Sequence, residues 1–392
     1  MHIWVMSNEY ETSRIIGGLG VVATQLTHHL VEMGHQLTVL TNHDLAEVLV
    51  NECGPLRIIH FPTRSDYYCR HRRKNQYRPI VEWIDQQRLA LPDLIHIHSV
   101  SFANLACYFR KTKGIPVVYT CHSLIGHESR VLTSFRRAHL IRQQRLLATC
   151  DQIVVPSRWQ RRSLATEYPI CKGKIVVIEN GVKLRGEPGS KPQVRMLFAG
   201  RLTRQKGIEE TLAALAILMK HNPAVQLDIA GTGTPNYHLR LRTLIKKWSL
   251  GRHVNLLGFV PPEKLSLLYS HYGAVIVPSK QESFGLVALE ALANGVPLVS
   301  TRSGGLAQFV TSDVAQIIPR INGKGIAIAV RRMWGNPAVT QQRVLRGLSL
   351  AQDFEWKAIA TRYAREFQKL CDSAGKGLLK QPTPEQEDKN DD

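Results

Sequence analysis

Residues 274–305 read AVIVPSKQESFGLVALEALANGVPLVSTRSGG and combine two strand signals with one helix signal. The β-branched run 274–277 predicts a buried strand, and the apolar residues of 285–294 lie on every face of a helix. A glycine and a proline end this helix before a second short strand at 297–301. A buried helix between two buried strands indicates a layered α/β domain.

Two carboxylates interrupt this apolar stretch, Glu282 in the turn before the helix and Glu290 inside it. A carboxylate among apolar neighbours needs hydrogen-bond donors, because burying it unpaired is costly or shifts its pKa. Sugar and ribose hydroxyls are suitable donors. For one glutamate taken alone, contact with solvent or with neighbouring backbone groups is the alternative.

The two glutamates are separated by seven residues, follow an apolar strand and precede Gly304-Gly305. In this setting the stretch resembles the nucleotide-sugar site of retaining GT-B glycosyltransferases of the family 4, or glycosyl transferases group 1, type. The resemblance implies a catalytic role for Glu282 and donor binding by Ser283, Phe284, Gly285, Leu286 and Glu290.

Strand signals alternate with helical patterns along the chain, which predicts parallel doubly wound sheets. In the first half the strand signals are 3–6, 37–40, 56–61, 94–98, 117–120 and 153–156. In the second half they are 196–199, 225–229, 254–257, 274–277, 297–301 and 315–318. A polar, turn-rich piece at 183–192 separates the two series, so the chain has two domains.

The expected fold class is therefore α/β, and the resemblance makes it GT-B, with two Rossmann-like domains facing across a cleft. We expect an N-terminal acceptor domain at 1–183 and a C-terminal nucleotide-sugar domain at 192–353. The amphipathic pattern at 354–370 predicts a helix, which in the resembled family crosses back to the first domain. The polar composition of 371–392 predicts a disordered tail.

The glycines of Gly17-Gly18-Leu19-Gly20 follow the first strand and open a helix. Glycines let a backbone approach a ligand closely, and the N–H groups of a helix start favour an anion. A dinucleotide site would need its glycines closer to the strand, and a turn without ligand is the other alternative. The resemblance places the donor diphosphate at Gly17 and Gly18.

Arg201 and Lys206 follow the first strand of the second domain within Gly200-Arg201-x(4)-Lys206-Gly207. Two cations at the carboxyl end of a parallel strand lie where such sheets bind ligands, and they can neutralise a departing diphosphate. This arrangement resembles the family's phosphate-binding pair, which implies catalytic roles for both. The resemblance also implies donor binding by Gly231 and Val260, in the turns after the next two strands.

His122 ends the strand at 117–120 and matches the position where the resembled family places a histidine beside the donor sugar and diphosphate. We therefore expect a catalytic role for His122. His98, at the end of another strand, is expected only to shape the cleft. A hydrogen-bonded loop histidine is the structural alternative for each, since the chain has 16 histidines.

Composition and charge limit the partners and the cellular location that can be expected for this protein. The net charge of +20 is spread over both halves without a nucleic-acid-binding motif, so no nucleic-acid partner is expected. The basic cluster at 70–74 is either a solvated loop or a contact with an anionic membrane or acceptor. No apolar run approaches a membrane span, and the chain opens directly on a strand, which predicts a cytoplasmic protein, or one peripheral at the inner membrane face. The seven scattered cysteines predict reduced thiols.

The resemblance implies transfer of a hexosyl group, with retention, from a UDP-hexose such as UDP-GlcNAc or UDP-glucose to an acceptor hydroxyl. No metal or other cofactor is expected, because no Asp-x-Asp site is evident and Arg201 and Lys206 supply the positive charge. The sequence does not choose among three acceptor classes, a lipid-linked sugar, a polysaccharide or a small metabolite such as an aminocyclitol. A nucleotide-sugar epimerase and a non-catalytic nucleotide-sugar binding protein are the alternatives. Gln308, where most relatives carry Glu, puts the donor sugar in question.

Overall fold

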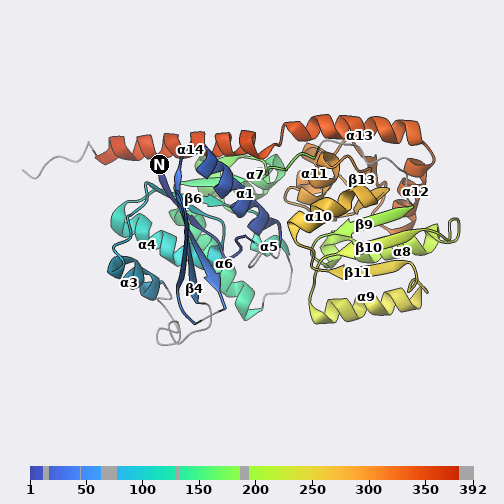
Figure 1. Ribbon diagram of the computed structural model, residues 1–392, viewed down its shortest axis with the longest axis horizontal. Coiled ribbons are helices and arrows are strands. Elements are labelled where there is room, and N and C mark those ends of the chain that lie inside the picture. Colours follow the sequence, from blue (N-terminus) through green and yellow to red (C-terminus); the bar gives the residue numbers. More distant parts are fainter. Residues whose placement is uncertain (12–16, 45, 63–76, 129–132, 186–193, 379–392) are drawn as a thin grey trace, which may run out of the picture.

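Two α/β domains make up the molecule, one built around an eight-stranded sheet and the other around a six-stranded sheet. Figure 1 shows the domains side by side, with the last two helices lying along one edge of both. This computed structural model describes residues 1–11, 17–44, 46–62, 77–128, 133–185 and 194–378.

The first sheet has the strand order β3-β4-β2-β1-β5-β6-β7-β8 and is parallel except where β3 pairs with β4. Its inner strands are almost entirely buried, as expected for a parallel sheet covered on both faces. The strands are β1 (His2–Met6), β2 (Gln36–His43), β3 (Leu49–Cys53), β4 (Leu56–Pro62), β5 (Leu94–Ile97), β6 (Val117–Thr120), β7 (Gln152–Val155) and β8 (Ile175–Val177).

Two hydrophobic clusters pack on opposite faces of this sheet. Successive residues of β1 enter different clusters, Trp4 joining Phe109 and Ile3 joining Val22, because side chains alternate across a strand. The helices are α1 (Gly18–Glu32), α3 (Arg78–Gln86), α4 (Ala103–Lys113), α5 (Ile125–Glu128), α6 (Ser134–Thr149) and α7 (Arg158–Glu167), with the short 3-10 helices η1 (Val100–Phe102) and η2 (Pro169–Lys174).

The second sheet is parallel throughout, in the order β11-β10-β9-β12-β13-β14. Its strands are β9 (Arg195–Ala199), β10 (Gln226–Ala230), β11 (Val254–Gly258), β12 (Ala274–Val277), β13 (Leu298–Ser300) and β14 (Gln316–Ile317). Its helices are α8 (Ile208–Leu218), α9 (Pro235–Lys247), α10 (Pro262–Leu268), α11 (Leu286–Ala293), α12 (Gly323–Trp334) and α13 (Pro337–Gln352), with η3 (Arg204–Lys206), η4 (Tyr269–His271) and η5 (Gly304–Gln308).

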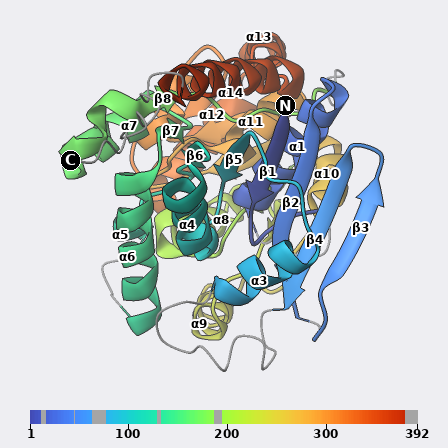
Figure 2. The ribbon, with the colours of Figure 1, turned by 90° about the vertical axis from the view of Figure 1, so that its left-hand side faces the viewer.

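Each strand segment predicted from the sequence is present, and two strands were missed. β3 is exposed at every position and forms the outer edge of the first sheet, as Figure 2 shows, so it lacks the apolar signal of a buried strand. β8 has only three residues at the opposite edge. The prediction of two doubly wound α/β domains is confirmed.

The last helix, α14 (Trp356–Leu378), runs back along the first domain (Figure 1). Trp356, Tyr363 and Phe367 are buried in the same cluster as Ile3. The helix was predicted to stop at Leu370, and that boundary is wrong, since residues 371–378 continue it.

The returning chain also meets the end of the first domain. Val182 donates its backbone N–H to Phe354, and a Cβ on Gly181 would lie 2.3 Å from the Trp356 ring, so only glycine fits beneath that ring. Most of the polar boundary piece, the basic cluster at 70–74 and the tail from 379 lie outside the described residues.

Candidate active site

A cavity of about 530 Å³ lies between the two domains and is lined by residues of both. Its walls come from loops at the carboxyl ends of the parallel strands, the usual ligand-binding edge of such sheets. All residues predicted from the sequence line it, namely Gly17, Gly18, His122, Arg201, Lys206, Gly231, Val260, Glu282, Ser283, Phe284, Gly285, Leu286 and Glu290. The structure thus brings them together, while their individual roles stay predictions.

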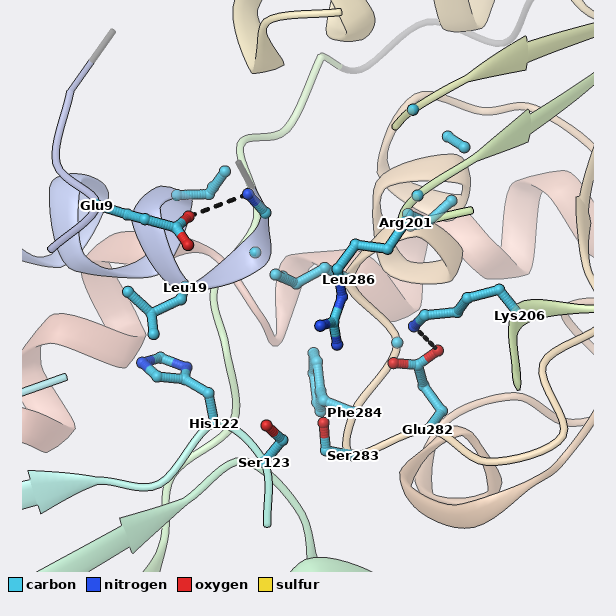
Figure 3. A pocket seen from close by; sticks show the side chains of 18 of the residues that line it. Glu9, Leu19, His122, Ser123, Arg201, Lys206, Glu282, Ser283, Phe284 and Leu286 are labelled. Carbon is cyan, nitrogen blue, oxygen red and sulfur yellow. Dashed lines mark hydrogen bonds and ion pairs between the residues drawn. The ribbon is translucent and has the colours of Figure 1, made fainter. Parts of the chain in front are cut away.

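The turn between β12 and α11 carries Glu282 into the cavity. Lys206 Nζ donates to Glu282 Oε2 at 2.6 Å, and Ser279 Oγ donates to the same oxygen at 3.1 Å. Both members of the ion pair are largely buried, with 23% and 13% of their side chains exposed. Figure 3 shows this pair on one side of the cavity, with the Arg201 guanidinium pointing into the space beside it.

The glycine pair after β13 explains how this turn is held. Gly304 has φ of +65°, and a Cβ there would lie 2.2 Å from the Glu282 carbonyl oxygen. A Cβ on Gly305 would lie 2.1 Å from the Ser283 carbonyl oxygen, while its N–H donates to Glu282 O. Any larger residue would displace the turn that presents Glu282, so the pair acts through backbone packing.

The carboxyl ends of β9 and β10 approach each other just before Arg201, the first of the two cations that follow β9. Gly231 has φ of +145°, and a Cβ there would lie only 1.9 Å from the Gly200 carbonyl oxygen. This close approach requires glycine and sets the backbone that leads into Arg201. Lys206 lies on the short helix η3 and is thereby directed back to Glu282.

Glu290 lies on α11, and its carboxylate accepts a hydrogen bond from Tyr269 Oη at 2.7 Å. Burial raises the pKa of the Glu290 carboxyl to about 7, and the Tyr269 hydrogen bond only partly offsets this effect. Tyr269 is itself buried. Sequence reasoning missed this tyrosine, because nothing in its spacing relates η4 to α11.

The first domain contributes neutral histidines to the opposite wall. His98 Nδ1 and His122 Nε2 lie 2.9 Å apart, so one donates a hydrogen bond to the other. The ring of His96 lies behind them, 4.2 Å from that of His98 between centroids. Burial lowers the pKa of His122 to about 4 and that of His98 well below its ordinary value. Both rings are therefore uncharged at neutral pH, and His98 supports His122 directly.

The start of α1 faces the same space. Gly17 donates its backbone N–H to Glu9 Oε2 at 3.0 Å, and Glu9 lines the cavity. Figure 3 shows Glu9 on the first-domain side of the cavity, across from Arg201. A phosphate would reach the Gly17 N–H only after the Glu9 carboxylate leaves it. Sequence reasoning missed Glu9, because it precedes the glycines by eight positions and belongs to no motif.

Within the described part of the chain, no group of three His, Cys, Asp or Glu side chains is arranged to hold a metal ion. Among its helices, none combines the length and apolar character needed to cross a membrane.

Both domains that line the cavity match known glycosyltransferase families. The family description Glycosyl transferases group 1 matches residues 183–342, and Glycosyltransferase Family 4 matches residues 16–185. A glycogen synthase from Mycobacterium tuberculosis is 30% identical over 304 residues, covering 75% of this chain and 71% of that protein.

Solved structures match the fold. Sucrose-phosphate synthase from Thermosynechococcus elongatus superposes with a TM-score of 0.78 at 22% identity, over 95% of this chain and 100% of its own. HepE from Anabaena, solved in complex with UDP-glucose, gives a TM-score of 0.73 at 16% identity, over 94% of this chain and 100% of its own.

These structural matches confirm the GT-B fold, and the sequence relatives favour neither an epimerase nor a non-catalytic binding protein. The two family descriptions match both domains of the cleft, and the glycogen synthase is 30% identical over most of both chains. The family membership therefore rests on matches along the chain as well as on the glycine, cation and glutamate motifs. The chain belongs to the glycosyl transferases group 1 and is a glycosyltransferase that takes its sugar from a nucleotide-sugar donor.

Proposed function

We propose that this enzyme transfers a hexosyl group from a UDP-hexose, UDP-glucose or UDP-GlcNAc, to an acceptor hydroxyl with retention, and that it does so without a metal ion. The observation that carries the proposal is the convergence of Arg201 and the Lys206–Glu282 pair in one cavity with Glu290 and the start of α1. The UDP-glucose bound by the HepE structure supports the choice of base and sugar.

The cations stabilise the charge that develops on the leaving diphosphate. Lys206 has three N–H donors, of which one contacts Glu282, so two remain for phosphate oxygens. The Arg201 guanidinium adds a second permanent charge that can bind two oxygens at once. Preorganised donors of this kind lower the barrier most where water is excluded, as between two closed domains.

The carboxylates bind hydroxyl groups of the donor. Glu282 is anchored by Lys206 and Ser279 through one oxygen, which leaves Oε1 to accept from a hydroxyl of the transferred sugar. Glu290, on α11, accepts from the ribose hydroxyls. Burial raises the pKa of Glu290, and Tyr269 donates one hydrogen bond to its carboxylate, so ribose hydroxyls would supply further donors to the charged form.

In the reaction the bond between the anomeric carbon and the diphosphate oxygen breaks, and a bond from that carbon to the acceptor oxygen forms on the same face. The acceptor proton passes to the departing phosphate oxygen, so the step balances without another base. His122, being neutral, contributes a hydrogen bond to the sugar or diphosphate rather than a charge. The product is an α-linked glycoside.

Saturation-transfer NMR with UDP-glucose, UDP-GlcNAc, ADP-glucose and GDP-mannose tests the donor assignment. The proposal expects contacts from the uridine and ribose protons of a UDP-hexose, followed by transfer of its sugar in an acceptor screen. The product should be α-anomeric by its proton coupling, and the rate should be the same with and without EDTA. Preference for another base, a β-linked product, or turnover abolished by EDTA and restored by Mg²⁺ would contradict the corresponding part.

A further inference from the structure

Polar contacts join the two domains outside the cavity, at Gln308. This residue ends η5 in the second domain, yet its side chain bonds only to the first domain in the hydrogen bonds of the described residues. Its Oε1 accepts from the backbone N–H of Arg158 at 2.9 Å, and its Nε2 donates to Glu179 Oε1 at 2.6 Å. Helix α7, which begins at Arg158, packs against η5 at the junction of the domains.

The two groups that contact the Gln308 side chain need opposite hydrogen-bonding roles, and an amide supplies both. The N–H of Arg158 belongs to the first turn of α7, where backbone donors have no partner inside the helix and need an acceptor. Glu179 needs a donor, and its other carboxylate oxygen lies 2.5 Å from the Arg362 guanidinium of α14. An amide offers an acceptor and a donor on one group, whereas an ionised carboxylate offers acceptors alone.

The start of α7 also contacts the turn between β12 and α11 that presents Glu282. Ser157, the cap of α7, is fully buried and donates its hydroxyl to the Ser283 carbonyl oxygen at 2.6 Å. Ser283 follows Glu282 and lines the cavity. The start of α7 is thus fixed to the second domain at two points, Gln308 and the turn that presents Glu282.

A third contact crosses the cavity itself. A Cβ on Gly18, at the start of α1, would lie 2.7 Å from the Leu286 side chain of α11, so the domains approach closely there. The two domains therefore touch both at the start of α7 and at the start of α1. Gln308 does not line the cavity, so its departure from the family's glutamate acts on the junction and not on the sugar pocket.

We propose that Gln308 and Glu179 form an interdomain latch, which favours closure of the cleft and positions the Glu282 turn through Ser157 and Ser283. Gln308 is a positioning residue, since it acts through that turn. A glutamate at this position would set one carboxylate against another where Nε2 now lies 2.6 Å from Glu179 Oε1, and so would open the junction. Exchanging the two side chains would restore one amide facing one carboxylate.

The test compares Gln308→Glu, Glu179→Gln and the exchanged double variant with the wild type. Gln342→Glu on the exposed face of α13 makes the same chemical change away from the junction and serves as the control. Small-angle X-ray scattering of the ligand-free proteins reports closure without any substrate. Steady-state kinetics with the proposed UDP-hexose, and calorimetry with UDP, separate turnover from nucleotide binding.

Gln308→Glu should enlarge the radius of gyration and lower kcat/KM about tenfold, the effect of losing a charge-assisted hydrogen bond, while UDP affinity stays within about twofold. The double variant should recover the wild-type dimensions and most of the activity. A Gln308→Glu protein that matches the control, or a double variant no better than that single variant, would overturn the latch. The UDP expectations rest on the proposed function, whereas the scattering result stands without it.

Discussion

The two walls of the cleft differ in how they are built and in what they offer a ligand. The wall from the second domain carries Arg201 and the Lys206–Glu282 ion pair, with each group within a few residues of a strand end. The wall from the first domain offers neutral histidines, a helix start and the Glu9 carboxylate, collected from three separate strands. One wall is therefore suited to hold the charged donor, and the other to act on it once the domains close.

This contrast separates binding from turnover. If the second domain holds the nucleotide, changes there should affect affinity and rate, whereas changes in the histidine pair should affect the rate alone.

Removal of either cation from the second wall should give the largest loss. Arg201→Ala and Lys206→Ala should each lower kcat by roughly a hundredfold to a thousandfold, the range found when a preorganised charge-stabilising donor is removed. The melting temperature should change little for Arg201→Ala, because an exposed cleft cation contributes little to folding. Lys206→Ala should also lower the melting temperature, because it leaves the largely buried Glu282 carboxylate without its ion-pair partner. Arg332→Ala on the exposed surface of α12 is the matched control. A rate close to that of this control would remove the cation from the mechanism.

His122→Ala should lower kcat by a factor between tens and hundreds, the value of about 2 to 4 kcal/mol for a hydrogen bond formed mainly in the transition state. Because burial lowers the pKa of His122 to about 4, its ring stays neutral above pH 6 and should add no titration to the rate there. Exposed His271→Ala provides the comparison. A fall in melting temperature that accounts for the lost activity would instead indicate a structural histidine.

The pH dependence of donor affinity should give an effect of about tenfold. The folded-state pKa of Glu290 is raised to about 7, so the carboxyl is mostly protonated at pH 6 and mostly ionised at pH 8. The ionised form is the better acceptor for ribose hydroxyls, so affinity for UDP-glucose should rise with pH, by up to tenfold for each pH unit below the pKa. Glu290→Gln should flatten this dependence. An unchanged profile in that variant would assign the titration to another group.

Much of the second wall could be predicted from the sequence, because its residues are few positions apart and follow clear strand signals. The Glu282, Arg201 and Gly231 positions all reached the cavity for this reason. The pairing of Lys206 with Glu282 was not predicted, since the two lie 76 positions apart and meet only through the order of β9 and β12.

The first wall was harder to predict, because its residues also come together through the order of the strands in the sheet. Glu9, His98 and His122 become neighbours because β1, β5 and β6 are adjacent in the sheet, an order that local patterns do not specify. The support of Glu290 by Tyr269 and the contacts of Gln308 are likewise long-range. The exposed strand β3 was missed because no buried face marks it.

Calorimetric titration of UDP into the wild type, Glu290→Ala and His122→Ala tests most directly the claim that the second domain holds the nucleotide. The account predicts that Glu290→Ala weakens UDP binding about tenfold to a hundredfold, the effect of losing charge-assisted hydrogen bonds, while His122→Ala keeps it within about twofold. Unchanged affinity in Glu290→Ala together with a large loss in His122→Ala would contradict the assignment of the two walls.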